Sequence, residues 1–82
     1  EIFEFYEELN YMDPYYIDCK NNIIYSYEWG GGYGIACEAY KIDGINISLI
    51  QSKETSYKKK FNIVEYSDAL GTIISIDTIY RD

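Results

Sequence analysis

The stretch IACEAYKIDGINISLIQ, residues 35–51, decides the fold of this chain. Asp43-Gly44 divides it into two segments in which apolar and polar residues partly alternate. Asp-Gly between such segments is the strongest short-range signal for a β-hairpin. We expect the two turn residues to bring Ile42 opposite Ile45, which would set the register of every other pair. The side of this hairpin that we expect to face the core carries Glu38, Tyr40, Ile42, Ile45, Ile47 and Leu49.

Outward from this hairpin, the chain is rich in residues that favour strands. It contains 14 isoleucines and 11 tyrosines, and β-branched and aromatic side chains pack well on a pleated sheet. Asn21-Asn22 suits a two-residue turn because asparagine tolerates positive φ, and the glycine run 30–34 breaks the pattern as a loop. A polar, lysine-rich connection is expected over residues 52–60. The further strands are expected at residues 15–20, 23–29, 61–66 and 72–81.

Residues 1–12 (EIFEFYEELNYM) predict an amphipathic helix, in which Ile2 and Phe5 begin an apolar stripe at helical spacing. The helix should end before Pro14, because the residue before a proline avoids the helical region. A helix this short is stable only when it packs on a sheet. The sequence therefore predicts a single small domain over residues 1–82 of the α+β class, with one N-terminal helix packed on an antiparallel β-meander of about five to six strands.

Cys19 and Cys37 fall on strands that a third strand separates in this meander. The strand spacing puts them roughly 10 Å apart, which is beyond the reach of a disulfide. Two small buried thiols are expected instead. No stretch of the sequence is apolar over the length that a membrane-spanning helix needs, and no signal peptide opens it. We therefore expect a cytoplasmic place of action.

Acidic residues dominate the first part of the chain. Residues 1–50 carry nine acidic and two basic side chains, residues 51–60 carry one and four, and residues 61–82 carry four and one, which together give the net charge of −7. Such a surface repels nucleic acid and anionic membranes and attracts a basic protein. A charge of this sign can also serve solubility alone.

The sequence offers little catalytic chemistry. It contains no histidine, which removes the usual general base of serine and cysteine hydrolases, and its two cysteines are too few for a zinc site. Glu28 and Glu38 could act as acid and base or hold a hard cation, but carboxylates on strands are far more often solvated surface. The glycine run lacks the spacing of a phosphate-binding loop. We therefore expect no enzyme activity, no metal and no cofactor.

Aromatic residues crowd the glycine run and form the first candidate site for partner binding. Trp and Tyr dominate interface hot spots because they bury a large area at low entropic cost. The same side chains could instead form the core face of a strand, and the sequence supports both interpretations equally. The second candidate is the acidic face of the predicted helix, whose spaced carboxylates could occupy sites meant for phosphates. The first site consists of Tyr25, Tyr27, Glu28, Trp29 and Tyr33, and the second of Glu4, Glu8 and Asp18.

These features indicate a small binding protein that acts by occlusion. We expect an acidic inhibitor that covers a basic partner enzyme, such as a nuclease toxin or another nucleic-acid enzyme, in the manner of an immunity protein or antitoxin. A phage-encoded anti-defence inhibitor is an alternative with the same character. A structural or assembly module that self-associates through its tyrosine face, without catalytic activity, is another. An exposed edge strand that joins the partner's sheet offers a second way to dock.

Overall fold

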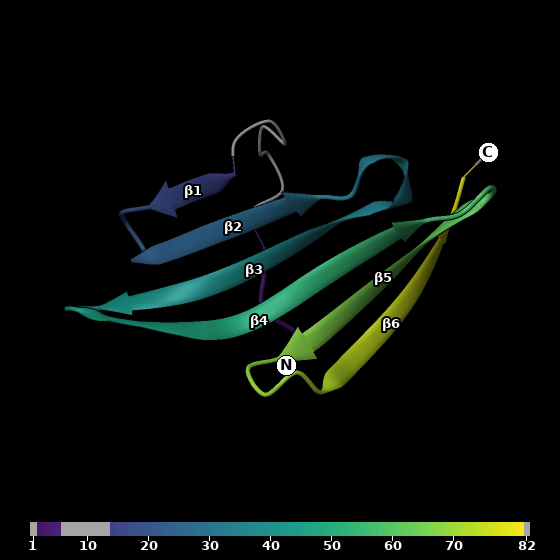
Figure 1. Cartoon of the computed structure of the whole chain (residues 1–82). Coiled ribbons are helices and arrows are strands. Elements are labelled where there is room, and N and C mark those ends of the chain that lie inside the picture. Colours follow the sequence, from purple (N-terminus) through teal and green to yellow (C-terminus); the bar gives the residue numbers. More distant parts are fainter. Residues whose placement is uncertain (1, 6–13, 82) are drawn as a thin grey trace.

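The chain folds into one six-stranded antiparallel sheet in which every strand pairs with its neighbour in the sequence (Figure 1). The computed structural model describes residues 2–5 and 14–81. The predicted meander is confirmed, with the strand order β1-β2-β3-β4-β5-β6. The strands are β1 (Tyr15–Asp18), β2 (Ile23–Trp29), β3 (Gly34–Asp43), β4 (Asn46–Tyr57), β5 (Phe61–Asp68) and β6 (Ile73–Tyr80).

The α+β prediction is wrong, because the described residues form a nearly all-β structure whose only helical element is a 3₁₀ turn at Gly31–Tyr33. Residues 2–5 belong to no helix, and the rest of the helix predicted over residues 1–12 lies outside the described part. Phe3 and Phe5 explain the difference, because both pack on the sheet. Helical residues two apart do not share a face, so a helix could not apply both rings to the sheet. No described helix is long and apolar enough to cross a membrane.

The β3–β4 hairpin forms, but its turn lies one residue later than predicted, so Ile42 pairs with Ile47 instead of Ile45. Asp43 pairs with Asn46, so the central turn residues are Gly44 and Ile45 instead of Asp43 and Gly44. Gly44 has a φ of 62°, and glycine is the residue that takes positive φ at the first central position of a type II′ turn. The turn is therefore set by the glycine and not by the aspartate before it.

The polar connection expected over residues 52–60 is wrong for most of its length, because β4 continues to Tyr57. Polar and charged residues in this part of β4 are tolerated because one face of the sheet is open to solvent. A bulge precedes it, at which Ile50 has no partner on β3. Ile50 packs against the core, and Gln51 beside it lies opposite Ala39. The bulge thus turns two consecutive side chains toward the same face.

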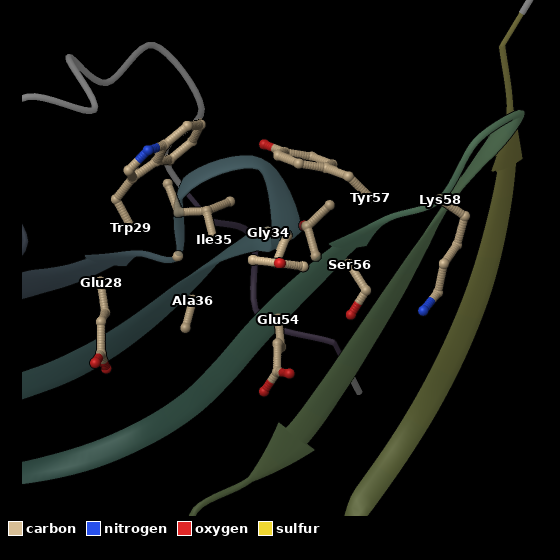
Figure 2. A pocket seen from close by; sticks show the side chains of 12 residues that line it. Glu28, Trp29, Gly34, Ile35, Ala36, Glu54, Ser56, Tyr57 and Lys58 are labelled. Atoms are coloured by element: carbon tan, nitrogen blue, oxygen red, sulfur yellow. The ribbon is translucent and has the colours of Figure 1, made fainter.

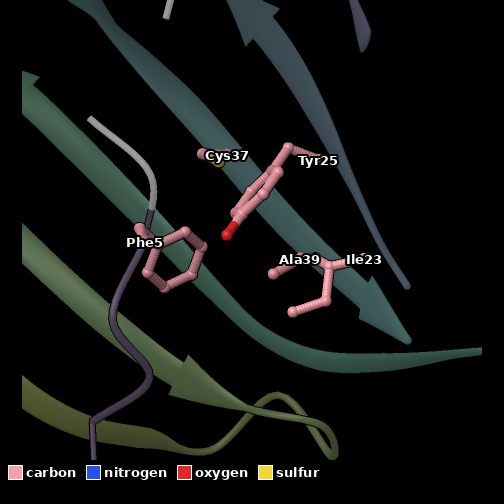
Figure 3. Close-up of a cluster of buried hydrophobic side chains, with 5 residues drawn as sticks. All are labelled: Phe5, Ile23, Tyr25, Cys37 and Ala39. Atoms are coloured by element: carbon pink, nitrogen blue, oxygen red, sulfur yellow. The ribbon is translucent and has the colours of Figure 1, made fainter. Parts of the chain in front are cut away.

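The core lies on one face of the sheet, which we call the covered face (Figure 3). Ala39 is completely buried there and Tyr25 is 3% exposed. The small side chain of Ala39 leaves room for the rings of Phe5 and Tyr25, whose centroids lie 6.3 Å apart. The buried cluster consists of Phe5, Ile23, Tyr25, Cys37 and Ala39, with Phe3, Tyr27, Ile50 and Tyr66 packed against it.

This core is on the opposite side of the β3–β4 hairpin from the one predicted. Tyr40 and Ile42 do lie on one face with Ile47 and Leu49, because Ile42 pairs with Ile47 and Tyr40 with Leu49. Ile47 is 60% exposed, however, and no described residue outside the sheet packs over these four side chains. The face with the larger apolar side chains is therefore the open one. Small residues mark the covered face, where the aromatic rings of residues 2–5 supply the bulk.

A hydrogen bond ties the N-terminal segment to the middle of the sheet. The backbone N–H of Phe3 donates to Oε1 of Gln51 at 2.9 Å. Gln51 is 8% exposed and is the buried polar side chain of the described core. A buried amide without a partner destabilises a fold by about 1–3 kcal/mol. The bond therefore orients the segment that carries Phe3 and Phe5.

The opposite face, which we call the open face, leaves the molecule thin and rich in surface. The extents along the principal axes are 44 × 27 × 18 Å. The accessible surface is 6183 Å², against about 5,100 Å² for a compact monomer of this length. The radius of gyration of 13.3 Å also exceeds the value of about 12 Å expected for a compact domain. The described residues thus cover only one face of the sheet.

The two cysteines differ in environment. Both are free thiols, and Cys37 is buried while Cys19 is exposed in the turn after β1. The expectation of two buried thiols is therefore wrong for Cys19, because β1 ends at Asp18 and the residue falls in the turn. Burial raises the pKa of Cys37 from 9.0 to about 11, against a smaller opposing effect of a hydrogen bond with Tyr27.

We expect alkylation by iodoacetamide at pH 8 to modify Cys19 rapidly and Cys37 only on unfolding. The raised pKa alone lowers the thiolate fraction of Cys37 about a hundredfold relative to an ordinary thiol, and burial restricts access further. Because the folded state holds this proton more tightly, the free energy of unfolding should fall as the pH rises from 9 toward 11. Mass spectrometry of the alkylated chain, with a Cys19→Ser variant as control, measures the two rates. Equal rates at both positions would contradict the buried placement of Cys37.

Candidate protein-binding face

A band of carboxylates crosses the middle of the open face. Strand pairing places Glu28 opposite Ala36, Ala36 opposite Glu54, and Glu54 opposite Glu65. Partners in an antiparallel sheet share a face, so these side chains form one row across β2 to β5. Glu38 lies in the next row, opposite Ser26 and Ser52. Ala36 therefore separates Glu28 from Glu54, whereas Glu54 and Glu65 face each other directly. The acidic band consists of Glu28, Glu38, Glu54 and Glu65.

The strands of the described open face supply no cation to the carboxylate band, although Lys58, in the turn after β4, points to the same side as Glu54 (Figure 2). By the alternation of side chains along each strand, no strand residue of the described open face is a lysine or arginine. Lys53 falls on the covered face, where its Nζ lies 5.9 Å from the ring centroid of Tyr66. Like charges directly opposite each other, as at Glu54 and Glu65, destabilise a sheet. A positive charge supplied by another molecule would therefore stabilise this row of carboxylates.

Two apolar patches flank this band. The first, at the β1–β4 end, includes Ile17 and Ile47, which are 55% and 60% exposed. The second, along β5 and β6, includes Ile76 and Tyr80, which are 57% and 77% exposed. Patches of this kind beside polar residues mark interaction sites on proteins. The first patch consists of Ile17, Ile24, Tyr40, Ile42, Ile47 and Leu49, and the second of Phe61, Ile63, Ile74, Ile76 and Tyr80.

The glycine turn between β2 and β3 borders a hollow of about 460 Å³ at one end of the sheet. Trp29 and Tyr57 lie on one side of it, with ring centroids 6.2 Å apart, whereas Glu28 and Glu54 point to the other side (Figure 2). Gly34 lines this hollow at the start of β3. A Cβ at this position would lie 2.1 Å from the backbone oxygen of Thr55, so only glycine allows β3 and β4 to approach this closely.

The structure separates the residues of the first predicted site. Trp29 and Tyr33 are 54% and 88% exposed at the glycine turn, and Glu28 is exposed beside them. Tyr25 belongs to the core, and Tyr27 stacks on it at 6.5 Å between centroids. The sequence allowed these residues to be either core or binding surface, and each interpretation holds for a different part of β2. Its first half is core and its last two residues are surface.

The second predicted site does not form a single acidic surface. Asp18 is the last residue of β1, and its carboxylate accepts a hydrogen bond from Nδ2 of Asn21 at 2.8 Å and from the backbone N–H of Lys20 at 3.1 Å. The side-chain bond from Asn21 is the main cause of the lowered pKa of Asp18. Glu4 is exposed in the N-terminal segment, and Glu8 lies outside the described residues. The helix that would have aligned these carboxylates is absent from residues 2–5.

Sequence reasoning missed Glu54, Glu65 and Tyr57 as site residues. Glu54 and Tyr57 were hidden by the polar connection expected at 52–60, although Thr55 and Tyr57 are both strand-forming residue types. Extending the alternation of β4 from Leu49 would have placed Glu54 on the face opposite Glu38, because the bulge at Ile50 shifts the alternation by one residue. Glu65 carries no sequence signal of its own, because only the pairing of β4 with β5 brings it opposite Glu54.

No family model, curated protein or solved structure matches this chain significantly. The described residues contain no group of three or more histidine, cysteine, aspartate or glutamate side chains placed to hold a metal ion. The site is therefore characterised by its surface alone: a solvent-exposed sheet face with a central acidic band and two apolar flanks.

Proposed function

We propose that this chain is a non-catalytic binding protein that inhibits a basic partner enzyme by covering it with the open face. The observation that supports the proposal is the band of four carboxylates set between two exposed apolar patches. Immunity proteins, antitoxins and phage-encoded anti-defence inhibitors are the classes with this mode of action. In each class the inhibitor acts by occlusion, and the proposed place of action is the cytoplasm.

Charge supports the encounter step of this function. The chain carries a net charge of −7, and an acidic surface speeds association with a basic partner at low ionic strength. Lysine or arginine side chains of the partner would lie over Glu54 and Glu65 and relieve their mutual repulsion. This gain is available in the complex and not in the free protein, so the row favours binding at a cost to the stability of the free sheet.

The apolar patches support the affinity of the complex. A flat sheet face with exposed Ile17, Ile47 and Ile76 provides area that a partner can remove from water. Tyr33 adds an exposed aromatic side chain at the glycine turn, whereas Trp29 points to the other side of the sheet from the carboxylates (Figure 2). The acidic band then determines which partner is accepted, and the flanks determine how tightly it is held.

Affinity capture from the native lysate, followed by binding measurements with the captured protein, tests this function. We expect the purified chain to retain a protein of high isoelectric point and to inhibit its activity at equimolar ratio. A Glu54→Lys/Glu65→Lys variant should bind at least about tenfold more weakly, because it places two cations under those of the partner. Added salt should slow the association rate of the wild-type chain.

A charge-matched variant keeps this test specific. Glu4→Lys/Asp43→Lys changes the net charge by the same amount, but neither residue belongs to the acidic band. It should retain most of the affinity at moderate salt. Equal losses in both variants would show that net charge alone drives binding, and loss only in the Glu4→Lys/Asp43→Lys variant would move the site to the N-terminal segment or to the β3–β4 turn. Either result rejects the open face as the binding site.

A further inference from the structure

We infer that β6 is a self-association edge, which pairs antiparallel with β6 of a second copy of this chain around a twofold axis at Ile76. β6 is the last strand of the meander and has no neighbour on its outer side among the described residues. Alternate N–H and C=O groups along it therefore face outward, as on any edge strand. This surface is distinct from the acidic band that carries the proposed function.

The side chains of β6 resemble those of an internal strand. Ile76 and Ile79 point to opposite faces by alternation, and they are 57% and 54% exposed. Strands covered on both sides have apolar residues on both faces, whereas edge strands carry lysine or proline that discourages pairing. β6 contains neither residue type. The other edge, β1, is only four residues long and follows Pro14, so it is protected where β6 is not.

The sequence of β6 favours one self-pairing register. A twofold axis perpendicular to the sheet requires that facing residues lie on the same face. One residue of β6 must therefore face its own copy across the axis. With Ile76 on the axis, Ile76 faces its own copy, Ser75 faces Asp77, and Ile74 faces Thr78. With Asp77 on the axis, two carboxylates face each other, which is destabilising. The Ile76 register instead gives the carboxylate of Asp77 a hydroxyl donor across the seam.

Charges at the two ends of β6 complement each other in this arrangement. The C-terminal end adjoins the basic turn Lys58–Lys60, because the backbone N–H of Arg81 donates to the carbonyl of Lys60 at 2.9 Å. The N-terminal end adjoins the β5–β6 turn, which begins at Asp68. Antiparallel pairing brings the basic end of one copy to the Asp68 end of the other, twice per dimer. The acidic open faces then lie side by side instead of stacked, which limits repulsion between them.

The bulge at the start of β6 bounds the paired segment. Tyr66 pairs with Ser75 and Ser67 with Ile73, so Ile74 has no partner on β5. Regular pairing between copies is expected over residues 74–78, which are centred on Ile76. The resulting twelve-stranded sheet carries two acidic bands on the same side. It would thus present two copies of the proposed inhibitory face.

Sedimentation of the purified full chain over a range of concentrations tests the association. We expect a concentration-dependent dimer that is weakened at least about tenfold in Ile76→Lys, because two ammonium groups would meet at the axis. Ile17→Lys is the matched control, since Ile17 lies on the same face at the other edge and is equally exposed, at 55%. A wild-type monomer at every concentration, or equal weakening in both variants, overturns the proposal.

Disulfide trapping identifies the register even if a lysine variant fails to fold. In a Cys19→Ser background, Ile76→Cys should form an intermolecular disulfide under mild oxidation, because facing residues have Cα atoms about 4.5–5.5 Å apart. Thr78→Cys should not, because the two copies of this residue would be separated by four positions, about 13 Å along the strand. Trapping through Thr78→Cys as fast as through Ile76→Cys overturns the register. These experiments need no partner enzyme, so their failure leaves the inhibitory function separately testable.

Discussion

Replacing Gly34 by alanine is expected to destabilise the fold by about 3 kcal/mol or more. The new Cβ would lie 2.1 Å from the backbone oxygen of Thr55, so β3 and β4 would have to separate at their most extensively paired hairpin. The φ of 157° is also one that residues with side chains rarely adopt. For a domain of this size the midpoint of thermal unfolding should fall by about 15 °C. Thermal unfolding followed by circular dichroism measures the change.

Gly32→Ala is the control for this substitution. It lies in the same turn, but a Cβ at Gly32 meets nothing within 4 Å. Its unfolding midpoint should stay close to that of the wild-type chain. A similar loss in both variants would mean that the turn needs flexibility at every glycine, and it would remove the special role of the close contact at Gly34.

Phe5→Ala is expected to lower the free energy of unfolding by about 3 kcal/mol. Phe5 is 7% exposed, and its ring centroid lies 6.3 Å from those of Tyr25 and Tyr66. No second layer of the described structure can fill the cavity, because residues 2–5 are the part that covers the sheet. The loss is a large share of the total stability, which is about 4–12 kcal/mol for a chain of this length. Urea denaturation monitored by tyrosine and tryptophan fluorescence gives the difference.

Ile2→Ala removes a side chain from the same segment, but from a position that is 45% exposed. It should cost less than about 1 kcal/mol. If Phe5→Ala is as mild as Ile2→Ala, the N-terminal segment does not pack on the sheet in solution. The covered face described above would then be incorrect.

Local sequence signals located the six strands, although β4 was predicted to end too early, but they did not predict the faces of the sheet. Asp43-Gly44 correctly located the central hairpin, and the Asn21-Asn22 turn correctly separated β1 from β2. The choice between neighbouring registers depends on which residue takes positive φ, and Gly44 does so. That choice cannot be read from the alternation of apolar residues, because isoleucine occurs on both faces of this sheet.

The N-terminal segment shows why apolar spacing alone can mislead. Ile2 and Phe5 fit a helical stripe, but Phe3 and Phe5 equally fit a spacing of two. The deciding factor is nonlocal: the covered face around Ala39 needs two aromatic rings side by side, and Gln51 offers an acceptor to the backbone of Phe3. Neither requirement is visible within residues 2–5 themselves.

The candidate site could be predicted only in part, for the same reason. The exposure of Trp29 and Tyr33 could be predicted from the glycine run, because it ends β2 and leaves the last residues of that strand uncovered. The facing pair of Glu54 and Glu65 depends on how two strands pair, and the apolar flanks depend on which face the N-terminal segment covers. Sequence patterns within one strand contain neither piece of information.

The hydrogen bond between Phe3 and Gln51 has a consequence for the order of folding. Each strand pairs with the next one along the chain, so the meander can grow by successive hairpins with short loops to close. The Phe3–Gln51 bond joins residues 48 positions apart and can form only after β4 is in place. Docking of residues 2–5 is therefore a late event, and its reversal exposes the core rings while the hairpins persist. Residues 2–5 thus dock on a sheet that has already assembled. Proteolysis near the N-terminus would begin from the form in which this segment is released.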